Sequence, residues 1–316
     1  MELPAVWTKN NGRYDFVLVK RLGKEFILKH SMYLFENTLS GEIKDSKDKA
    51  EKFRTHLNDL EQKNSWIILG YDLGEKASKG YAVVQLKELG SLMMELKNNR
   101  RKNLCFYHMI IPSESLFLFL DLEYETSCNK DKNEFEMVKM IKELIIECIQ
   151  DHFEVIIKEE DFILERSSNE VKVSWHLFLP NFVMKDCFEM GELIKFLVNS
   201  IMECAKNGEK KEEWMKYTPL IIKKKKSEEK FVDGCFIDDN IYRSHGLFRI
   251  VENSKFGKER YFVPFDVEKM EERKLDSEEE LQKYIETVYF HNVSPNFKCV
   301  DLPDSFKGKK RKEMKV

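Results

Sequence analysis

Residues 116–123 read Leu-Phe-Leu-Phe-Leu-Asp-Leu-Glu, an apolar run that ends in two carboxylates. A nearly continuous apolar run of this length is typical of a strand buried on both faces of a sheet. Because side chains alternate along a strand, Asp121 and Glu123 leave the same face, about 7 Å apart. Two carboxylates about 4 Å apart repel by roughly 4 kcal/mol at an effective dielectric near 20, so a shared site favours a bound cation or proton. The alternative is a pair of acids facing water at a sheet edge.

Strand and helix patterns alternate on both sides of this stretch. Strands are predicted over residues 66–71, 81–85 and 171–179, and two short strands between 236 and 250 around a turn at His245-Gly246. Helices are predicted over residues 87–97 and 277–289, after Asn133, and from Asp186 to about Ala205. Asn133 and Asp186 are expected to cap their helices. This order of elements predicts an α+β fold.

The composition indicates a folded protein without a membrane-spanning helix. Of the 316 residues, 42% are hydrophobic and 23 are Phe, which argues against a disordered chain. The length favours one large domain or two intertwined lobes. The longest apolar runs reach about five residues, whereas a membrane helix needs roughly 18. The N-terminus lacks the pattern of a secretory signal. We therefore expect an intracellular protein with no membrane partner.

The charge balance excludes a general attraction to a polyanion, because 53 basic residues face 56 acidic ones and the net charge is −3. A nucleic-acid partner must then be held by local clusters. Basic residues gather at Lys97–Lys102, Lys223–Lys226 and Lys307–Lys315. Each cluster can equally be a solvated face, and the last can be a nuclear address.

The seven cysteines include no Cys-x-x-Cys pair, which excludes a zinc ribbon or knuckle. Cys105 with His108, and Cys148 with His152, are weaker pairs at metal-ligand spacing. Cysteines of the core are the simpler interpretation, and no structural zinc is predicted.

A second polar face follows the predicted strand over residues 171–179. Lys172, Ser174 and His176 alternate with apolar residues, and each can donate to phosphate oxygens. These residues alone are equally compatible with an ordinary half-exposed strand that has no phosphate-binding role. Further along, Asp238 adds a third acid, with Arg249 and Lys255 after it. Three acids with a set of phosphate donors are what two-metal nucleotidyl transfer requires.

Taken in order, these motifs resemble the archaeo-eukaryotic primase superfamily, and within it the eukaryotic primase-polymerases. The motifs are Asp121-Leu122-Glu123, Ser174-Trp175-His176 and Phe236-Ile237-Asp238, continued by Phe248-Arg249 and Ser254-Lys255. The resemblance covers about residues 66–258. It implies a catalytic core of two mixed α/β lobes, an RRM-like palm and a smaller α/β module, with the active site in the cleft between them.

The resemblance also implies roles for individual residues. Asp121, Glu123 and Asp238 would hold Mg²⁺ or Mn²⁺ in a two-metal site, with Asp233 and Asp239 as rivals of Asp238. The incoming nucleoside triphosphate would be held by Lys172, Ser174, His176, Arg249 and Lys255, with Lys79 near the nucleotide and Tyr107 near its sugar.

The expected organisation has four parts: an accessory N-terminal layer (1–65) with an exposed helix near 47–62, a catalytic core (66–303), a mobile Lys-rich insertion within that core (206–230), and a basic tail (304–316). The family's C-terminal Cys/His zinc module has no counterpart here. Extension of a primer is therefore expected, with priming dependent on another chain or absent.

The function implied is that of a template-directed DNA primase/polymerase, with tolerance of damaged templates or repriming at stalled forks as further implications. Its partners would be a DNA template and primer, nucleoside triphosphates and single-strand-binding proteins, in the nucleus or the mitochondrion. Two alternatives stay open: a catalytically inactive nucleic-acid-binding module on the same fold, and a metal-dependent nuclease that uses only the acids.

Overall fold

The computed structural model describes residues 50–51, 54–55, 58, 66–72, 79–98, 104–153, 155–207, 212–227, 230–293 and 297–306. Most of the predicted accessory layer and its helix, and most of the basic tail, lie outside these residues. The chain divides into two compact units, each made of separate stretches. The first unit comprises Met1–Met109, Leu247–Arg260 and Leu275–Glu286, and the second comprises Ile110–Gly246, Tyr261–Lys274 and Thr287–Val316.

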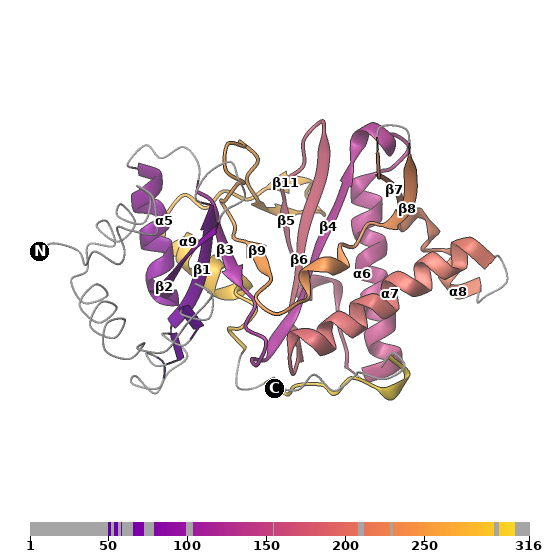
Figure 1. Ribbon diagram of the computed structural model, residues 1–316, viewed down its shortest axis with the longest axis horizontal. Coiled ribbons are helices and arrows are strands. Elements are labelled where there is room, and N and C mark those ends of the chain that lie inside the picture. Colours follow the sequence, from indigo (N-terminus) through magenta and orange to yellow (C-terminus); the bar gives the residue numbers. More distant parts are fainter. Residues whose placement is uncertain are drawn as a thin grey trace, which may run out of the picture. The chain divides into compact units, whose positions relative to one another are not determined.

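The first unit is built on an antiparallel sheet of order β2-β1-β3-β9 (Figure 1). Its strands are β1 (Trp66–Asp72), β2 (Lys79–Gln85), β3 (Phe106–Met109) and β9 (Leu247–Arg249), and its helices are η1 (Leu86–Glu88), α5 (Leu89–Asn98) and most of α9 (Glu278–Val288). Gly90 lets α5 cross α9 closely, because an added Cβ would lie 2.8 Å from the Cα of Gln282. The β-β-α opening predicted from the sequence is confirmed.

The second unit contains a five-stranded sheet of order β11-β10-β5-β6-β4. Its strands are β4 (Leu116–Glu125), β5 (Ile163–Arg166), β6 (Lys172–Met184), β10 (Val263–Asp266) and β11 (Glu271–Glu272). Two long helices, α6 (Glu134–Phe153) and α7 (Cys187–Asn207), run beside this sheet (Figure 1). The apolar run at residues 116–120 is at most 1% exposed, as a core strand should be. The mixture of sheets and helices is compatible with the predicted α+β class.

The predicted caps are present. The Asn133 side-chain oxygen accepts from the Phe135 amide at 3.1 Å, and the Asp186 carboxylate accepts from the amides of Phe188 and Glu189 at 2.8 and 2.9 Å. The Ser277 hydroxyl accepts from the Glu280 amide at 3.1 Å at the start of α9. These side chains satisfy amides that have no partner within the first helical turn.

The Lys-rich segment is more ordered than the sequence predicted. In place of a mobile connection, its described part contains α8 (Glu212–Met215), η4 (Thr218–Leu220) and β7 (Ile221–Lys225), which pairs with β8 (Phe231–Cys235). Three of its side chains are buried in the core and at most 2% exposed, although lysine dominates the composition of the segment: Tyr217, Leu220 and Ile222. Asn129 also accepts from the Lys223 amide at 2.7 Å, which fixes the hairpin to the turn after β4.

Two shorter stretches also differ from the prediction. Between residues 236 and 250 the structure has the single bridge residue Ile237, then η5 (Asp239–Ile241), then β9, in place of two strands. Residues assigned to the basic tail form η6 (Asp304–Phe306). Phe306 is 4% exposed and packs on Phe153 and Phe196, so η6 belongs to the packed core of the second unit.

None of the helices in the described stretches is both long and apolar enough to cross a membrane.

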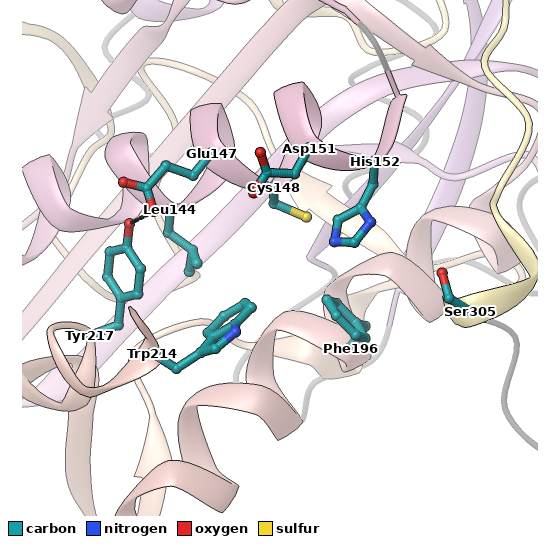
Figure 2. A pocket seen from close by; sticks show the side chains of 9 residues that line it. All are labelled: Leu144, Glu147, Cys148, Asp151, His152, Phe196, Trp214, Tyr217 and Ser305. Atoms are coloured by element: carbon teal, nitrogen blue, oxygen red, sulfur yellow. Dashed lines mark hydrogen bonds between the residues drawn. The ribbon is translucent and has the colours of Figure 1, made fainter. Parts of the chain in front are cut away.

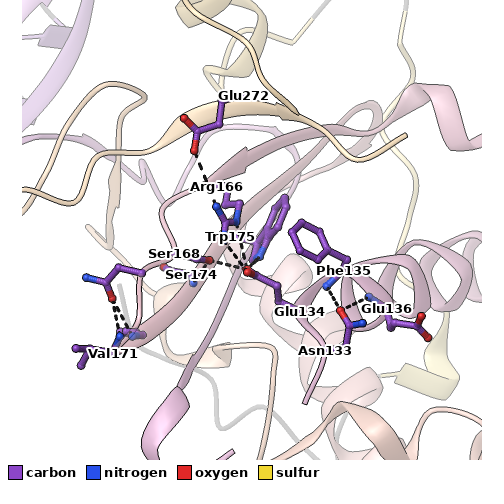
Figure 3. Close-up of polar contacts among 12 residues, drawn as sticks. Asn133, Glu134, Phe135, Glu136, Arg166, Ser168, Val171, Ser174, Trp175 and Glu272 are labelled. Atoms are coloured by element: carbon purple, nitrogen blue, oxygen red, sulfur yellow. Dashed lines mark hydrogen bonds and ion pairs between the residues drawn. The ribbon is translucent and has the colours of Figure 1, made fainter. Parts of the chain in front are cut away.

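Glu134 joins the start of α6 to strands β5 and β6 (Figure 3). Its carboxylate accepts from Arg166 Nη2, Ser168 Oγ and Trp175 Nε1, each at 2.7 Å. The Glu134 side chain is only 13% exposed. Burial acts to raise the pKa of Glu134, but the hydrogen bonds from Arg166, Ser168 and Trp175 outweigh it and the pKa is lowered. The ionised carboxylate therefore stabilises the second unit.

We predict that Glu134→Gln lowers the free energy of unfolding by about 1–3 kcal/mol at pH 7, because Arg166 loses its charged partner. The pKa of Glu134 in the folded protein lies below the unfolded value of about 4.3. The difference in unfolding free energy between wild type and variant is therefore complete above about pH 5 and is lost as the pH falls through the folded pKa. Urea unfolding of both proteins from pH 3 to 7 measures this difference. Glu136→Gln, on the same helical turn but exposed, is the control, and equal losses in the two variants would contradict the assignment.

Candidate active site

Two distant stretches bring three carboxylates together in the second unit. Leu122 of β4 bridges Ile237 in antiparallel fashion. The Glu123 amide donates to the Phe236 carbonyl at 2.9 Å, and the Asp238 amide donates to the Asp121 carbonyl at 2.8 Å. This register sets Asp238 opposite Asp121, so their side chains leave the same face, as does Glu123 two residues along. The structure thus places the three predicted acids side by side.

The predicted phosphate donors lie on the neighbouring strand. β6 pairs with β4 so that His176 lies opposite Asp121, Ser174 opposite Glu123 and Lys172 opposite Glu125. Opposed residues share a face, so Ser174 and His176 belong to the same face as the acids. Both are 2% exposed. Lys172 forms an ion pair with Glu123.

Glu165, which was not predicted from the sequence, is fully buried on β5 opposite His176. Its carboxylate lies 3.0 Å from His176 Nδ1, and the Phe262 ring stacks on the imidazole with centroids 3.5 Å apart. With Nδ1 turned to this carboxylate, Nε2 is the nitrogen through which His176 can reach a phosphate oxygen. An acid inside the short apolar run Phe162-Ile-Leu-Glu-Arg166 was the available signal.

The two alternatives to Asp238 as the third acid, Asp233 and Asp239, lie at other positions. Asp233 is on β8, exposed, and its carboxylate pairs with Lys223 Nζ at 2.5 Å. Asp239 follows Asp238 within η5. Burial first, and then the charges of Asp121, Asp238 and Asp239, raise the pKa of Tyr242 well above its usual value. The Tyr242 hydroxyl, which donates to the Phe119 carbonyl at 2.5 Å, is therefore neutral beside these acids.

Carboxylate oxygens are the ligands that Mg²⁺ and Mn²⁺ prefer, so the donor chemistry of this face suits those ions. Within the described ranges, however, no group of three or more His, Cys, Asp or Glu side chains is arranged to hold a metal. Asp238 instead accepts from the amide and the side chain of Asn240, at 3.1 and 2.8 Å. Lys172 contacts Glu123 through Oε2 and Asn240 contacts Asp238 through Oδ1, so each carboxylate has a second oxygen that these contacts do not use.

The first unit gathers the other predicted nucleotide contacts around Asp72, a residue that the sequence analysis did not identify. The Asp72 carboxylate forms an ion pair with Lys79 and accepts from the Tyr107 hydroxyl at 2.9 Å and the Phe256 amide at 3.1 Å. Lys79 Nζ lies 3.8 Å from the centre of the Tyr107 ring. The Asp72 side chain, at the end of β1, is only 7% exposed, so these three donors replace the water that would otherwise solvate its charge.

Arg249 and Lys255 belong to the same unit. Arg249 on β9 lies opposite Tyr107 on β3, so the two side chains share a face of the sheet. Lys255 directly precedes Phe256, whose amide binds Asp72. Burial, and then the charge of Asp72, raise the pKa of the Tyr107 hydroxyl and that of the Cys105 thiol to about 11. Both groups are therefore neutral at physiological pH.

Comparison with known proteins adds one relative. The chain is similar to a primase/polymerase. It is 23% identical over 208 residues to the DNA-directed primase/polymerase protein of Danio rerio. The match covers 60% of this chain, which spans 39% of the relative's length. No family model matches the chain. This distant similarity agrees with the resemblance drawn from the motifs and supports a relationship of the primase-polymerase kind.

We predict that His176 and Glu165 are energetically coupled. In a double-mutant cycle with His176→Asn and Glu165→Gln, the coupling should reach about 1–3 kcal/mol, because each change leaves the other buried group without this contact. Urea unfolding of the four proteins measures it. His152→Asn, an exposed histidine on α6, should show no coupling to Glu165→Gln, and a His176 coupling below about 0.5 kcal/mol would refute the pairing.

Proposed function

We propose that this chain is a template-directed nucleotidyltransferase of the primase-polymerase type, which adds nucleotides from nucleoside triphosphates to the 3′ hydroxyl of a primer. The observation that carries the proposal is the meeting of Asp121, Glu123 and Asp238 on one face, beside Ser174 and His176. The distant similarity to a primase/polymerase supports it independently.

The second unit supplies the chemistry in this proposal. Asp121, Glu123 and Asp238 hold Mg²⁺ or Mn²⁺, which, when bound, would activate the 3′ hydroxyl and neutralise charge on the phosphates. The Ser174 hydroxyl and His176 Nε2 donate to the oxygens of the triphosphate. Glu165, at Nδ1, and the stacked Phe262 ring fix the orientation of the imidazole. Lys172, once released from Glu123, adds a positive charge for the phosphates.

The first unit supplies nucleotide contacts from one sheet face and the turn after β9. Lys79, Arg249 and Lys255 provide cationic donors that suit phosphate oxygens. Asp72 holds Lys79 and the Tyr107 hydroxyl in place, so the tyrosine ring has a fixed position from which to contact a sugar. In this proposal DNA is the template and the primer carries the reacting hydroxyl.

Two alternatives predict different products from one assay. An inactive nucleic-acid-binding module leaves a labelled primer unchanged, and a metal-dependent nuclease shortens it. The nuclease would use only the acids and would leave Ser174, His176 and Arg249 without a role. Incubating the chain with a labelled primer-template, nucleoside triphosphates and Mn²⁺ separates the three, because only the proposed enzyme lengthens the primer.

We predict that Asp121→Asn and Asp238→Asn each reduce primer extension at least about 100-fold, equivalent to about 2.7 kcal/mol of transition-state stabilisation. Each change removes a carboxylate of the ion-binding face without changing its size. Rates of primer extension in Mn²⁺ measure the effect. Asp239→Asn tests the register, and Asp131→Asn, at 80% side-chain exposure, is the control; both should keep nearly full activity. Loss of activity in Asp239→Asn but not in Asp238→Asn would transfer the role to Asp239.

We predict that Arg249→Ala raises the KM for the nucleoside triphosphate by about 10- to 100-fold, since a hydrogen bond to a charged group contributes roughly 1.5–3 kcal/mol. Steady-state kinetics at varied nucleotide concentration measures the KM. Arg243→Ala, which removes an exposed arginine of the second unit, serves as the matched control. An unchanged KM in Arg249→Ala would remove this residue from the nucleotide site.

A further inference from the structure

The second unit contains a cavity of about 490 Å³ between α6, α7 and α8 (Figure 2). This volume is within the roughly 300–1,000 Å³ range of ligand pockets. None of its lining residues belongs to the candidate active site, so the proposed function does not use it. The lining residues are Leu144, Glu147, Cys148, Asp151, His152, Phe196, Trp214, Tyr217 and Ser305.

The sequence builds this pocket from one stripe of α6 and three aromatic side chains. Leu144, Glu147, Cys148 and Asp151 recur at spacings of three and four residues, so they point from one side of the helix (Figure 2). Leu144 and Cys148 are at most 6% exposed and form an apolar base.

Phe196, Trp214 and Tyr217 supply the aromatic walls from α7 and α8 and the turn after α8 (Figure 2). The rings of Phe196 and Trp214 meet edge to face, with centroids 6.1 Å apart. The walls of the pocket are therefore aromatic on this side.

Two carboxylates give the pocket a negative rim. Glu147 accepts from the Tyr217 hydroxyl at 2.8 Å and pairs with Lys216, while Asp151 is exposed one helical turn along α6. Burial acts to raise the pKa of Glu147, but the hydrogen bonds from Lys216 and Tyr217 outweigh it and the pKa is lowered. Burial, and then the charge of Asp151, raise the pKa of the Cys148 thiol to about 12. At neutral pH the Glu147 carboxylate is thus ionised, and the Cys148 thiol below it is uncharged.

We infer that this pocket binds an organic cation, an ammonium or guanidinium group carried on an aromatic or branched apolar body, as presented by a basic peptide segment of a partner protein. The cation would pair with Asp151, since Glu147 already binds Lys216 and Tyr217, and would face the aromatic rings, which attract cations. The apolar body would fill the base between Leu144 and Cys148. This inference is separate from the proposed nucleotidyl transfer.

The composition of the chain's own basic segment favours a partner as the occupant. Residues 307–316 read Lys-Gly-Lys-Lys-Arg-Lys-Glu-Met-Lys-Val, which suits the acidic rim but offers no aromatic side chain for the base of the pocket. A basic peptide that also carries an aromatic residue matches both parts.

The test uses the full chain with ¹⁵N-labelled tryptophan indoles, which give four signals, one for each Trp. Trp214→Phe assigns the Trp214 signal. The probe is acetyl-Lys-Phe-Lys-amide, with acetyl-Lys-Gly-Lys-amide and acetyl-Glu-Phe-Glu-amide as controls for the apolar body and the charge. We expect only the first peptide to shift the Trp214 signal to saturation. Asp151→Asn should weaken binding about 2- to 5-fold, the effect of an exposed ion pair, and Glu143→Gln, on the same helix outside the pocket, should not.

Several results would overturn the inference: no shift with the first peptide, equal shifts with either control peptide, or equal effects of Asp151→Asn and Glu143→Gln. A full chain carrying Lys309→Gln, Lys310→Gln and Arg311→Gln tests the remaining occupant. Tighter probe binding by that variant would identify the chain's own basic segment as the ligand and overturn the assignment to a partner. Unchanged binding supports the partner. Primer extension plays no part in these measurements, so their failure is distinguishable from failure of the proposed function.

Discussion

The antiparallel pairing of β4 with β6 is the constraint on which the second unit depends. It aligns Asp121 with His176 and Glu123 with Ser174. A slip of one residue would turn the acids and the donors to opposite faces, because side chains alternate along each strand. The apolar residues of the other face hold the register: Leu120, Leu122 and Leu177 are fully buried and cannot be exchanged with charged neighbours without a large loss of stability. The bulge near Pro180 ends the strict register only beyond the candidate site, at Phe117 and Leu118.

Much of this arrangement could be predicted from the sequence because it follows from local periodicity. The run at residues 116–123, the alternation at 172–177 and the capping residues Asn133 and Asp186 each carry a pattern that specifies one element. The sequence could not show which elements pair with which. Glu165 and Asp72 were missed for that reason: the role of each comes from partners on other elements, His176 on β6 for Glu165, and Tyr107 on β3 with Phe256 after β9 for Asp72.

The lysine-rich segment shows a different limit of sequence analysis. Composition alone predicted a mobile connection, because lysines outnumber apolar residues there. Three apolar side chains, Tyr217, Leu220 and Ile222, are enough to bury one side of the segment, and the lysines remain exposed on β7. Lysine in a strand is compatible with order where the strand lies in a small two-stranded sheet with solvent at its edge. Composition alone therefore does not separate a folded lysine-rich segment from an unstructured one, whereas the positions of its few apolar residues do.

Each unit pairs an acid with a lysine among its predicted nucleotide or ion contacts, Glu123 with Lys172 and Asp72 with Lys79. The two pairs differ in what a ligand would do to them. Asp72 has two further donors, Tyr107 and the Phe256 amide, so its charge stays satisfied if Lys79 turns toward a phosphate. Glu123 lies two residues from Asp121 on β4, and Asp238 lies opposite Asp121, so releasing Lys172 would restore repulsion among three carboxylates. In the proposed mechanism a divalent cation is therefore the natural replacement for Lys172, and its binding would free that lysine for the triphosphate at the same time.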